Sequence, residues 1–225
     1  MTIDHVGHWL LDDAPWARII GRIAMPLFCM LVAYGVTKSR NPWKFALRLF
    51  VFALAVQIFL NLYWYRNIFA QGWYNVFFTL SLGVLAASLL KICIKMMKSD
   101  INLRRVLCVV ATIFGAIAVA AVPIIIDSVL DIQIDYGMPG VLLVVMFYLA
   151  VQHSMKALKI TAGISIAVMC LLMGIWIQWF ALLALPFIFV FVDRKLKISV
   201  VEKYAFYLFY PLHMVVIFLI QMWFF

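Results

Sequence analysis

The feature that most constrains this chain is a series of long apolar stretches separated by short polar loops. A helix needs about 20 mostly apolar residues to cross roughly 30 Å of hydrocarbon. About eight stretches reach or nearly reach this length, at 16–36, 45–63, 74–94, 106–126, 138–153, 158–175, 177–192 and 204–223. The sequence therefore predicts an all-α fold, a polytopic bundle of transmembrane helices.

The composition is typical of the same class of protein. The 225 residues are 68% hydrophobic and 12% charged, whereas soluble domains are usually about 45–50% apolar and about 25% charged. No linker or low-complexity tract divides the chain, so we expect one integral membrane domain over residues 1–225. The expected environment is a lipid bilayer.

The basic residues that give the net charge of +9 lie almost entirely between the apolar stretches. They gather in alternate loops, at 38–44, 91–105, 156–159 and 194–203, and the positive-inside rule places such loops in the cytoplasm. Both termini are then expected outside. No basic stripe with interleaved aromatic residues is present, so a nucleic-acid partner is not expected.

Few ionisable residues interrupt the apolar stretches, and Arg22 is the most conspicuous of them. A charge at the centre of a span costs at least about 2.5–3.5 kcal/mol on insertion scales, so such a residue is a functional candidate. One interpretation is a structural ion pair with Asp4, Asp12 or Asp13. The other is binding of a substrate or of an oxyanion, and the two are compatible.

Two histidines are further candidates. His213 lies near the middle of the last apolar stretch, where an imidazole is expensive, and Tyr210 places a hydroxyl nearby. It is either a hydrogen-bonded packing residue or a functional group. His5 follows Asp4, but neighbouring side chains on a helix diverge by about 100°, so adjacency alone is weak support for a dyad.

Motifs of several common enzyme classes are missing. The sequence contains no Walker loop, dinucleotide fingerprint, nucleophile elbow or zinc-protease helix, which argues against nucleotide hydrolysis, hydride transfer and zinc proteolysis. The cysteines are scattered without metal-ligand spacing, so no metal is expected. The residues alone predict a membrane protein with a polar site of unknown chemistry.

Four short sequence motifs, taken in their order along the chain, resemble those of the TraX family. They are IDHVG at 3–7, GRIAMPLF at 21–28 running to Gly35, DYG at 135–137 with Gly140, and FYLFYPLH at 206–213. The family includes the acetylase of conjugative F-pilin, a polytopic inner-membrane protein that acetylates the N-terminal amine of pilin. The resemblance implies a multi-pass protein of the bacterial inner membrane, with acetyl-CoA as acetyl donor and a pilin as acceptor.

The resemblance also implies which residues act. The candidate catalytic residues are Asp4, His5, Arg22 and His213, and the candidate substrate-binding residues are Asp135, Tyr136 and Tyr210. We expect His5, oriented or supported by Asp4, to be the general base, with Arg22 and Tyr136 stabilising the oxyanion. Direct transfer is favoured over an acetyl-histidine on His5 or His213.

Basic residues of an inner loop are the candidates for binding the acetyl-CoA phosphates, namely Lys38, Arg40 and Arg48, although simple positive-inside anchoring is the more common reason for such residues. Asp135 and Tyr136 also read as a turn that caps a helix. Three other functions stay open: an acyltransferase for an envelope sugar or lipid, a transporter, and a non-enzymatic assembly factor. The oligomeric state is not predicted.

One departure from the family concerns the first residues. A hydrophobic helix usually leads into the Asp-His motif of the family, whereas only Met1 and Thr2 precede Ile3 here. The expectation is either a chain shortened at its N-terminus, which would restore a ninth span and a cytoplasmic N-terminus, or a branch without that helix.

Overall fold

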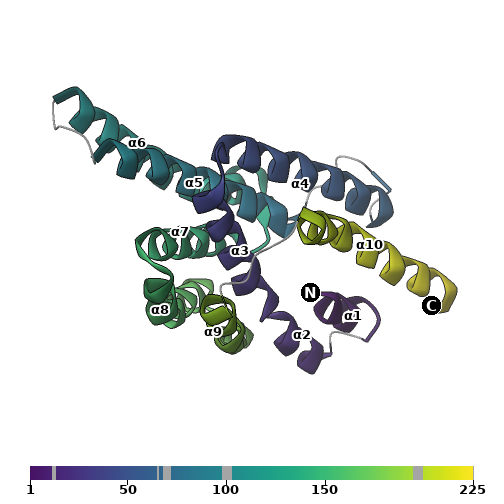
Figure 1. The fold of residues 1–225 in the computed structure, drawn as a ribbon. Coiled ribbons are helices and arrows are strands. Elements are labelled where there is room, and N and C mark those ends of the chain that lie inside the picture. The colour runs from purple at the N-terminus through teal and green to yellow at the C-terminus, as the bar shows by residue number, and fades with distance from the viewer. Residues whose placement is uncertain (12–13, 65, 68–71, 98–102, 195–199, 225) are drawn as a thin grey trace. The chain divides into compact units, whose positions relative to one another are not determined.

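The computed structural model describes residues 1–11, 14–64, 66–67, 72–97, 103–194 and 200–224 (Figure 1). These residues form two compact units. Unit 1 contains Met1–Phe28 and Lys159–Phe225, and unit 2 contains Cys29–Leu158. The prediction of a single domain stays a prediction.

Six described helices are long and apolar enough to cross a membrane, at Pro15–Lys38, Pro42–Tyr63, Val76–Met97, Leu103–Leu130, Met155–Met173 and Trp176–Asp193. Two shorter apolar helices cover Gly137–His153 and Leu208–Trp223. Each of the predicted stretches overlaps one of these helices, so the predicted all-α polytopic fold is confirmed. The orientation of the termini stays a prediction, and parts of two basic loops, 98–102 and 195–199, lie outside the described residues.

The first predicted stretch is not one continuous helix. It consists of α2 (Pro15–Gly21) and α3 (Ala24–Lys38), with Arg22 and Ile23 in the turn between them. Pro26 has no N–H to donate to the carbonyl of Arg22, so the helical ladder cannot run through this point. The N–H of Arg22 is shared between the carbonyls of Arg18 at 3.2 Å and Ile19 at 3.3 Å, and the N–H of Ile23 donates to the carbonyl of Ile20 at 3.3 Å.

The seventh predicted stretch also differs from a regular α-helix. It begins as the 3₁₀-helix η1 (Trp176–Ala184) and continues as α9 (Leu185–Arg194). Pro186 cannot donate to the carbonyl of Leu182, which accepts the N–H of Leu185 in a 3₁₀ pattern instead. Apolar composition predicts the stretch but not this change of helix type.

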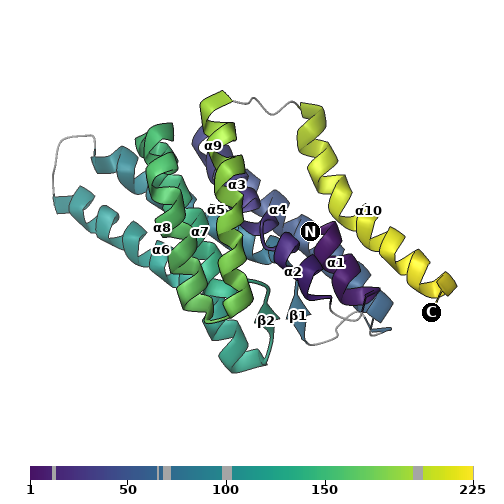
Figure 2. The same cartoon turned by 90° about the horizontal axis from the view of Figure 1, so that it is seen from below.

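Unit 2 is organised around α5 (Val76–Met97), which packs against α4 (Pro42–Trp64), α6 (Leu103–Leu130) and α7 (Gly137–His153). Small residues let these helices approach closely. A Cβ added at Gly83 would lie 2.7 Å from Cβ of Val144 on α7, so only glycine fits there. Two short parallel strands, β1 (Trp73–Tyr74) and β2 (Gln133–Ile134), lie side by side at one end of the unit (Figure 2).

A buried amide cluster fixes the start of α5. The side-chain amide of Asn75 donates to the carbonyl of Ala53 at 2.9 Å and to Oε1 of Gln57 at 3.0 Å. The amide of Gln57 in turn donates to Asn61 and to the carbonyl of Trp73. These groups satisfy one another, which is what polar residues in an apolar bundle require.

Unit 1 contains α1 (Thr2–Trp9), α2, most of α8 (Met155–Met173), η1, α9 and α10 (Val200–Phe224). Helix α1 packs against both α2 and α10, and α2 packs against η1. Gly7 and Gly21 permit the closest approach, because added Cβ atoms would lie 2.3 Å from Cβ of Ala17 and 2.2 Å from Cβ of Asp4. These packings bring three sequence-distant segments together.

Candidate functional site

Helix α1 presents two candidate side chains to different neighbours. Asp4 lies against Gly21 of α2, and His5 contacts His213 of α10. This divergence is the one expected for adjacent residues on a helix. The hydrogen-bond partner of His5 is therefore His213, whereas the expectation from the sequence was orientation or support by Asp4.

The two imidazoles form an in-line pair. Nδ1 of His5 lies 2.9 Å from Nε2 of His213, and the ring planes are only 9° apart. The ring centroids are 5.1 Å apart, close to the sum of the N–N distance and the two ring radii. The rings therefore meet edge to edge, with one nitrogen lone pair aimed at the N–H of the other ring, and are not stacked face to face.

The carbonyl of Phe209 assigns the protons of this pair. Nδ1 of His213 lies 2.8 Å from that oxygen, which can only accept, so Nδ1 carries the hydrogen. In a neutral His213, Nε2 is then the acceptor and Nδ1 of His5 must be the donor. This assignment leaves the lone pair of His5 on Nε2, where it is available to a proton.

Burial and charge keep His5 neutral. Burial is the main cause that lowers the pKa of His5 to about 3, and positive charge on His213 would lower it further. The imidazole is therefore in its basic form throughout the neutral range. Tyr210 flanks both rings, with its ring centroid 6.0 Å from that of His5 and 5.2 Å from that of His213.

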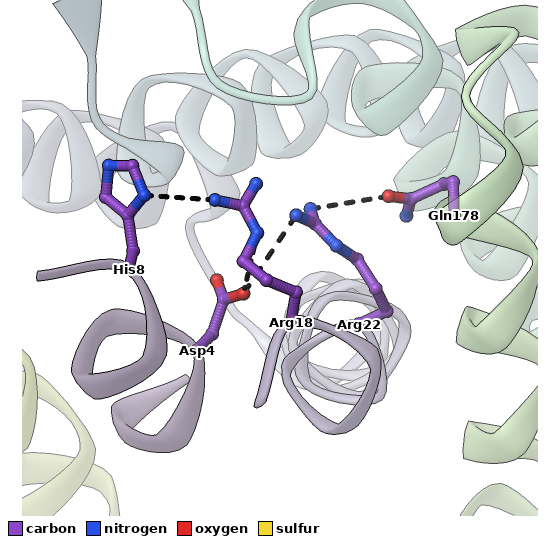
Figure 3. A network of polar contacts seen from close by, with 5 residues as sticks. All are labelled: Asp4, His8, Arg18, Arg22 and Gln178. Carbon is purple, nitrogen blue, oxygen red and sulfur yellow. Dashed lines mark hydrogen bonds and ion pairs between the residues drawn. The ribbon is translucent and has the colours of Figure 1, made fainter. Parts of the chain in front are cut away.

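On the face of α1 that packs against α2, Asp4 lies between two guanidinium groups (Figure 3). Its Oδ1 is 3.6 Å from Nε of Arg18 and 4.0 Å from Nη2 of Arg22. Arg18 also donates to Nδ1 of His8 at 3.2 Å, and Arg22 donates to Oε1 of Gln178 at 3.4 Å. The ion-pair interpretation of Arg22 is thus confirmed for Asp4.

This network of five residues, Asp4, His8, Arg18, Arg22 and Gln178, contains two guanidinium groups and one carboxylate. Arg22 is the buried cation of this network, with only 9% of the residue exposed. A buried charge of this kind is stabilised by a nearby anion. The other predicted partners, Asp12 and Asp13, lie outside the described residues.

Gln178 is the residue that the sequence analysis missed. It is 1% exposed and lies in η1, in a stretch that was read only as a span. A signal was present, because an amide in an otherwise apolar run must be hydrogen-bonded when it is buried. Uncharged polar residues of the apolar stretches were not among the candidates.

Two predicted substrate-binding residues, Asp135 and Tyr136, belong to unit 2. The carbonyl of Asp135 accepts a hydrogen bond from the hydroxyl of Thr79, and its N–H donates to the carbonyl of Tyr74 at 2.9 Å. Tyr136 has a φ of 60° and is the N-cap of α7. These contacts fit the interpretation as a turn that caps a helix, and substrate binding stays a prediction.

The three predicted cofactor-binding residues lie at the connection between α3 and α4 in unit 2. Lys38, Arg40 and Arg48 are exposed. Nζ of Lys38 lies 5.4 Å from the ring centroid of Tyr34, and Cζ of Arg48 lies 5.5 Å from that of Phe45. Accessible cations on one helix–turn–helix have the chemistry that phosphates need, and their binding of acetyl-CoA stays a prediction.

The chain is similar to one protein family and to individual known proteins. A family model described as "TraX protein" matches residues 1–221. The "Probable fimbrial assembly protein FimC, serogroup H1" of Dichelobacter nodosus is 28% identical over 242 aligned positions, covering 95% of this chain and 87% of that protein. The "Uncharacterized protein RP591" of Rickettsia prowazekii is 37% identical over 59 positions, covering 26% of this chain and 22% of that protein. No solved structure matches.

Proposed function

The chain belongs to the TraX family, and on that premise we propose that it is an acetyltransferase of the bacterial inner membrane that transfers an acetyl group from cytosolic acetyl-CoA to the N-terminal amine of a pilin. The observation that carries the proposal is the in-line pair of His5 and His213, which leaves Nε2 of His5 as a base. The similarity to a protein named for fimbrial assembly supports a pilus subunit as acceptor.

The base is needed because the acceptor is an amine. The neutral amine attacks the thioester, and its nitrogen becomes positively charged as the bond to the acetyl carbon forms, so it must lose a proton. Nε2 of His5 takes the proton that the amine loses on attack. His213 holds His5 in the required tautomer and accepts the hydrogen bond from Nδ1, which becomes stronger when His5 gains a positive charge.

The reaction then balances as a direct transfer. The amine nitrogen forms a bond to the acetyl carbon, the carbon–sulfur bond breaks, and His5 returns the proton to the departing sulfur as a thiol. Arg22 supplies positive charge for the oxyanion that develops on the carbonyl oxygen. In this scheme Asp4 holds Arg22 and Arg18 in place, and His213 takes over the orienting role first assigned to Asp4.

The direct test uses the purified protein in proteoliposomes with labelled acetyl-CoA and a pilin peptide. We expect label on the N-terminal amine of the peptide, with none in empty liposomes. Pilins from cells that contain the protein should be heavier by the mass of one acetyl group than those from cells that lack it. If the label were found on a sugar or lipid, the acceptor would be an envelope molecule and not a pilin. If no acceptor were labelled, the enzymatic proposal would be overturned.

The pH dependence follows from the state of His5. Its lowered pKa, with His213, His8 and Arg18 as the neighbouring basic groups, keeps it neutral above about 3. The rate should therefore rise with pH until the acceptor amine is deprotonated, near about 8, and then level off. An acceptor whose amine has a lower pKa should shift this midpoint by the same amount. If the midpoint of the pH–rate profile lay near 6.5 and did not change with the acceptor, the assignment of His5 as a base that is already neutral would be contradicted.

The same shift makes the contact between α1 and α10 sensitive to acid. The unfolded histidine has a pKa of 6.5 and the folded one a pKa of about 3, so the folded state binds fewer protons between these values. The stabilisation is fully present above 6.5 and is lost as the pH falls toward 3. Rates should consequently be compared at neutral pH and above.

A further inference from the structure

The side-chain amide of Gln178 has an NH₂ group with no hydrogen-bond partner among the described residues. Gln178 is 1% exposed, and a buried donor left unsatisfied costs about 1–3 kcal/mol. Such a group in a folded protein calls for an explanation. An acceptor atom that arrives with a ligand would satisfy it.

The orientation of this amide is fixed by chemistry. Arginine has only donors, so the amide group turned toward Arg22 must be the oxygen (Figure 3). The NH₂ group therefore cannot exchange places with Oε1 without losing the bond to Arg22. The NH₂ group of Gln178, with its two N–H donors, is therefore held beside the guanidinium of Arg22 that the proposed reaction uses.

The backbone of Gln178 is anchored as well. Its N–H donates to the carbonyl of Ile175 at 3.0 Å, and its carbonyl accepts from Sγ of Cys170 at 3.1 Å. Gly174, with a φ of 65°, makes the turn that leads into η1. A donor fixed at both its backbone and its side chain needs little reorganisation when charge develops nearby, which is the requirement for transition-state stabilisation.

We propose that Gln178 is a catalytic residue whose amide NH₂ binds the carbonyl oxygen of the transferred acetyl group, so that Gln178 and Arg22 together form the oxyanion site. This inference rests on the proposed acetyl transfer and adds to it a residue from η1. As the amine nitrogen bonds to the acetyl carbon, the carbonyl oxygen gains the negative charge that these donors meet. The guanidinium of Arg22, which is bonded to Gln178, favours the same species.

The rival explanation is that Gln178 only positions Arg22. The substitution Gln178→Glu distinguishes this positioning role from the oxyanion role. Glutamate keeps an oxygen for Arg22 but replaces the NH₂ group with an acceptor. A positioning role predicts a kcat close to that of the wild type. The oxyanion role predicts that kcat falls by about 10²–10³-fold, the usual effect of removing one such donor. Gln152→Glu, the same change at an exposed position of α7, should leave kcat unchanged.

A second measurement does not depend on how much protein folds. The ratio of rates with acetyl-CoA and with its dithioester analogue, in which sulfur replaces the carbonyl oxygen, reports hydrogen bonding to that oxygen. This ratio should fall at least about tenfold, or about 1.4 kcal/mol, in both Gln178→Glu and Gln178→Met. An unchanged ratio in active variants, or a loss of kcat confined to Gln178→Met, would overturn the inference. An inactive wild-type protein would instead overturn the acetyltransferase proposal itself.

Discussion

Replacing His5 with alanine is expected to lower the rate of acetyl transfer by about 10²–10⁴-fold, the usual contribution of a general base. The variant removes Nε2, the nitrogen whose lone pair the contacts through His213 and Phe209 leave available. It leaves Asp4, Arg18 and Arg22 in place, so acetyl-CoA binding should change little. The measurement is kcat and KM with labelled acetyl-CoA in proteoliposomes.

The matched control is His153→Ala, because His153 is exposed at the end of α7 in unit 2. This variant should insert into membranes and transfer acetyl groups at the wild-type rate. Added imidazole should partly restore activity to His5→Ala, since that truncation opens space beside Nε2 of His213. Wild-type activity in His5→Ala would remove His5 as the base, and the acetyl-histidine alternative at His5 would fall with it.

The fold was largely predictable because the bilayer imposes one strong rule on sequence. Each predicted stretch overlaps an apolar helix, since hydrocarbon thickness fixes how many apolar residues a span needs. The breaks within the first and seventh stretches were not predicted from that rule. They depend on a missing N–H at Pro26 and Pro186, which changes hydrogen bonding without changing apolar composition.

The site was predictable only in part. The cost of burying charged and polar groups singled out Arg22 and His213, whereas adjacency gave only weak support for Asp4 and His5, which the family resemblance strengthened. The pairing of His5 with His213 joins residues 208 positions apart, and no local pattern encodes such a contact. The structure pairs His5 with His213 and lays Asp4 against α2, while the catalytic roles of these residues stay predictions. Gln178 was missed because an uncharged amide costs less to bury than an ionisable group and so stands out less in an apolar stretch.

Removing the positive charge at Arg22 should inactivate the protein without unfolding it. In Arg22→Met the oxyanion site loses its charged donor, and kcat is expected to fall by about 10²–10³-fold. Arg18 stays 3.6 Å from Asp4, so the carboxylate keeps a cationic partner. The substitution also removes a buried charge, whose desolvation is costly. The thermal midpoint in detergent should therefore stay the same or rise while activity is lost.

Arg22→Lys tests whether charge alone is enough. Lysine keeps the positive charge but lacks the planar fork that faces Asp4 with one nitrogen and Gln178 with another, so most of the loss in kcat should persist. The control is Arg104→Met, at an exposed position near the start of α6, which should leave kcat unchanged. If Arg22→Met lost activity only in proportion to a fall in thermal midpoint, Arg22 would be a structural partner of Asp4 and the oxyanion would need another donor.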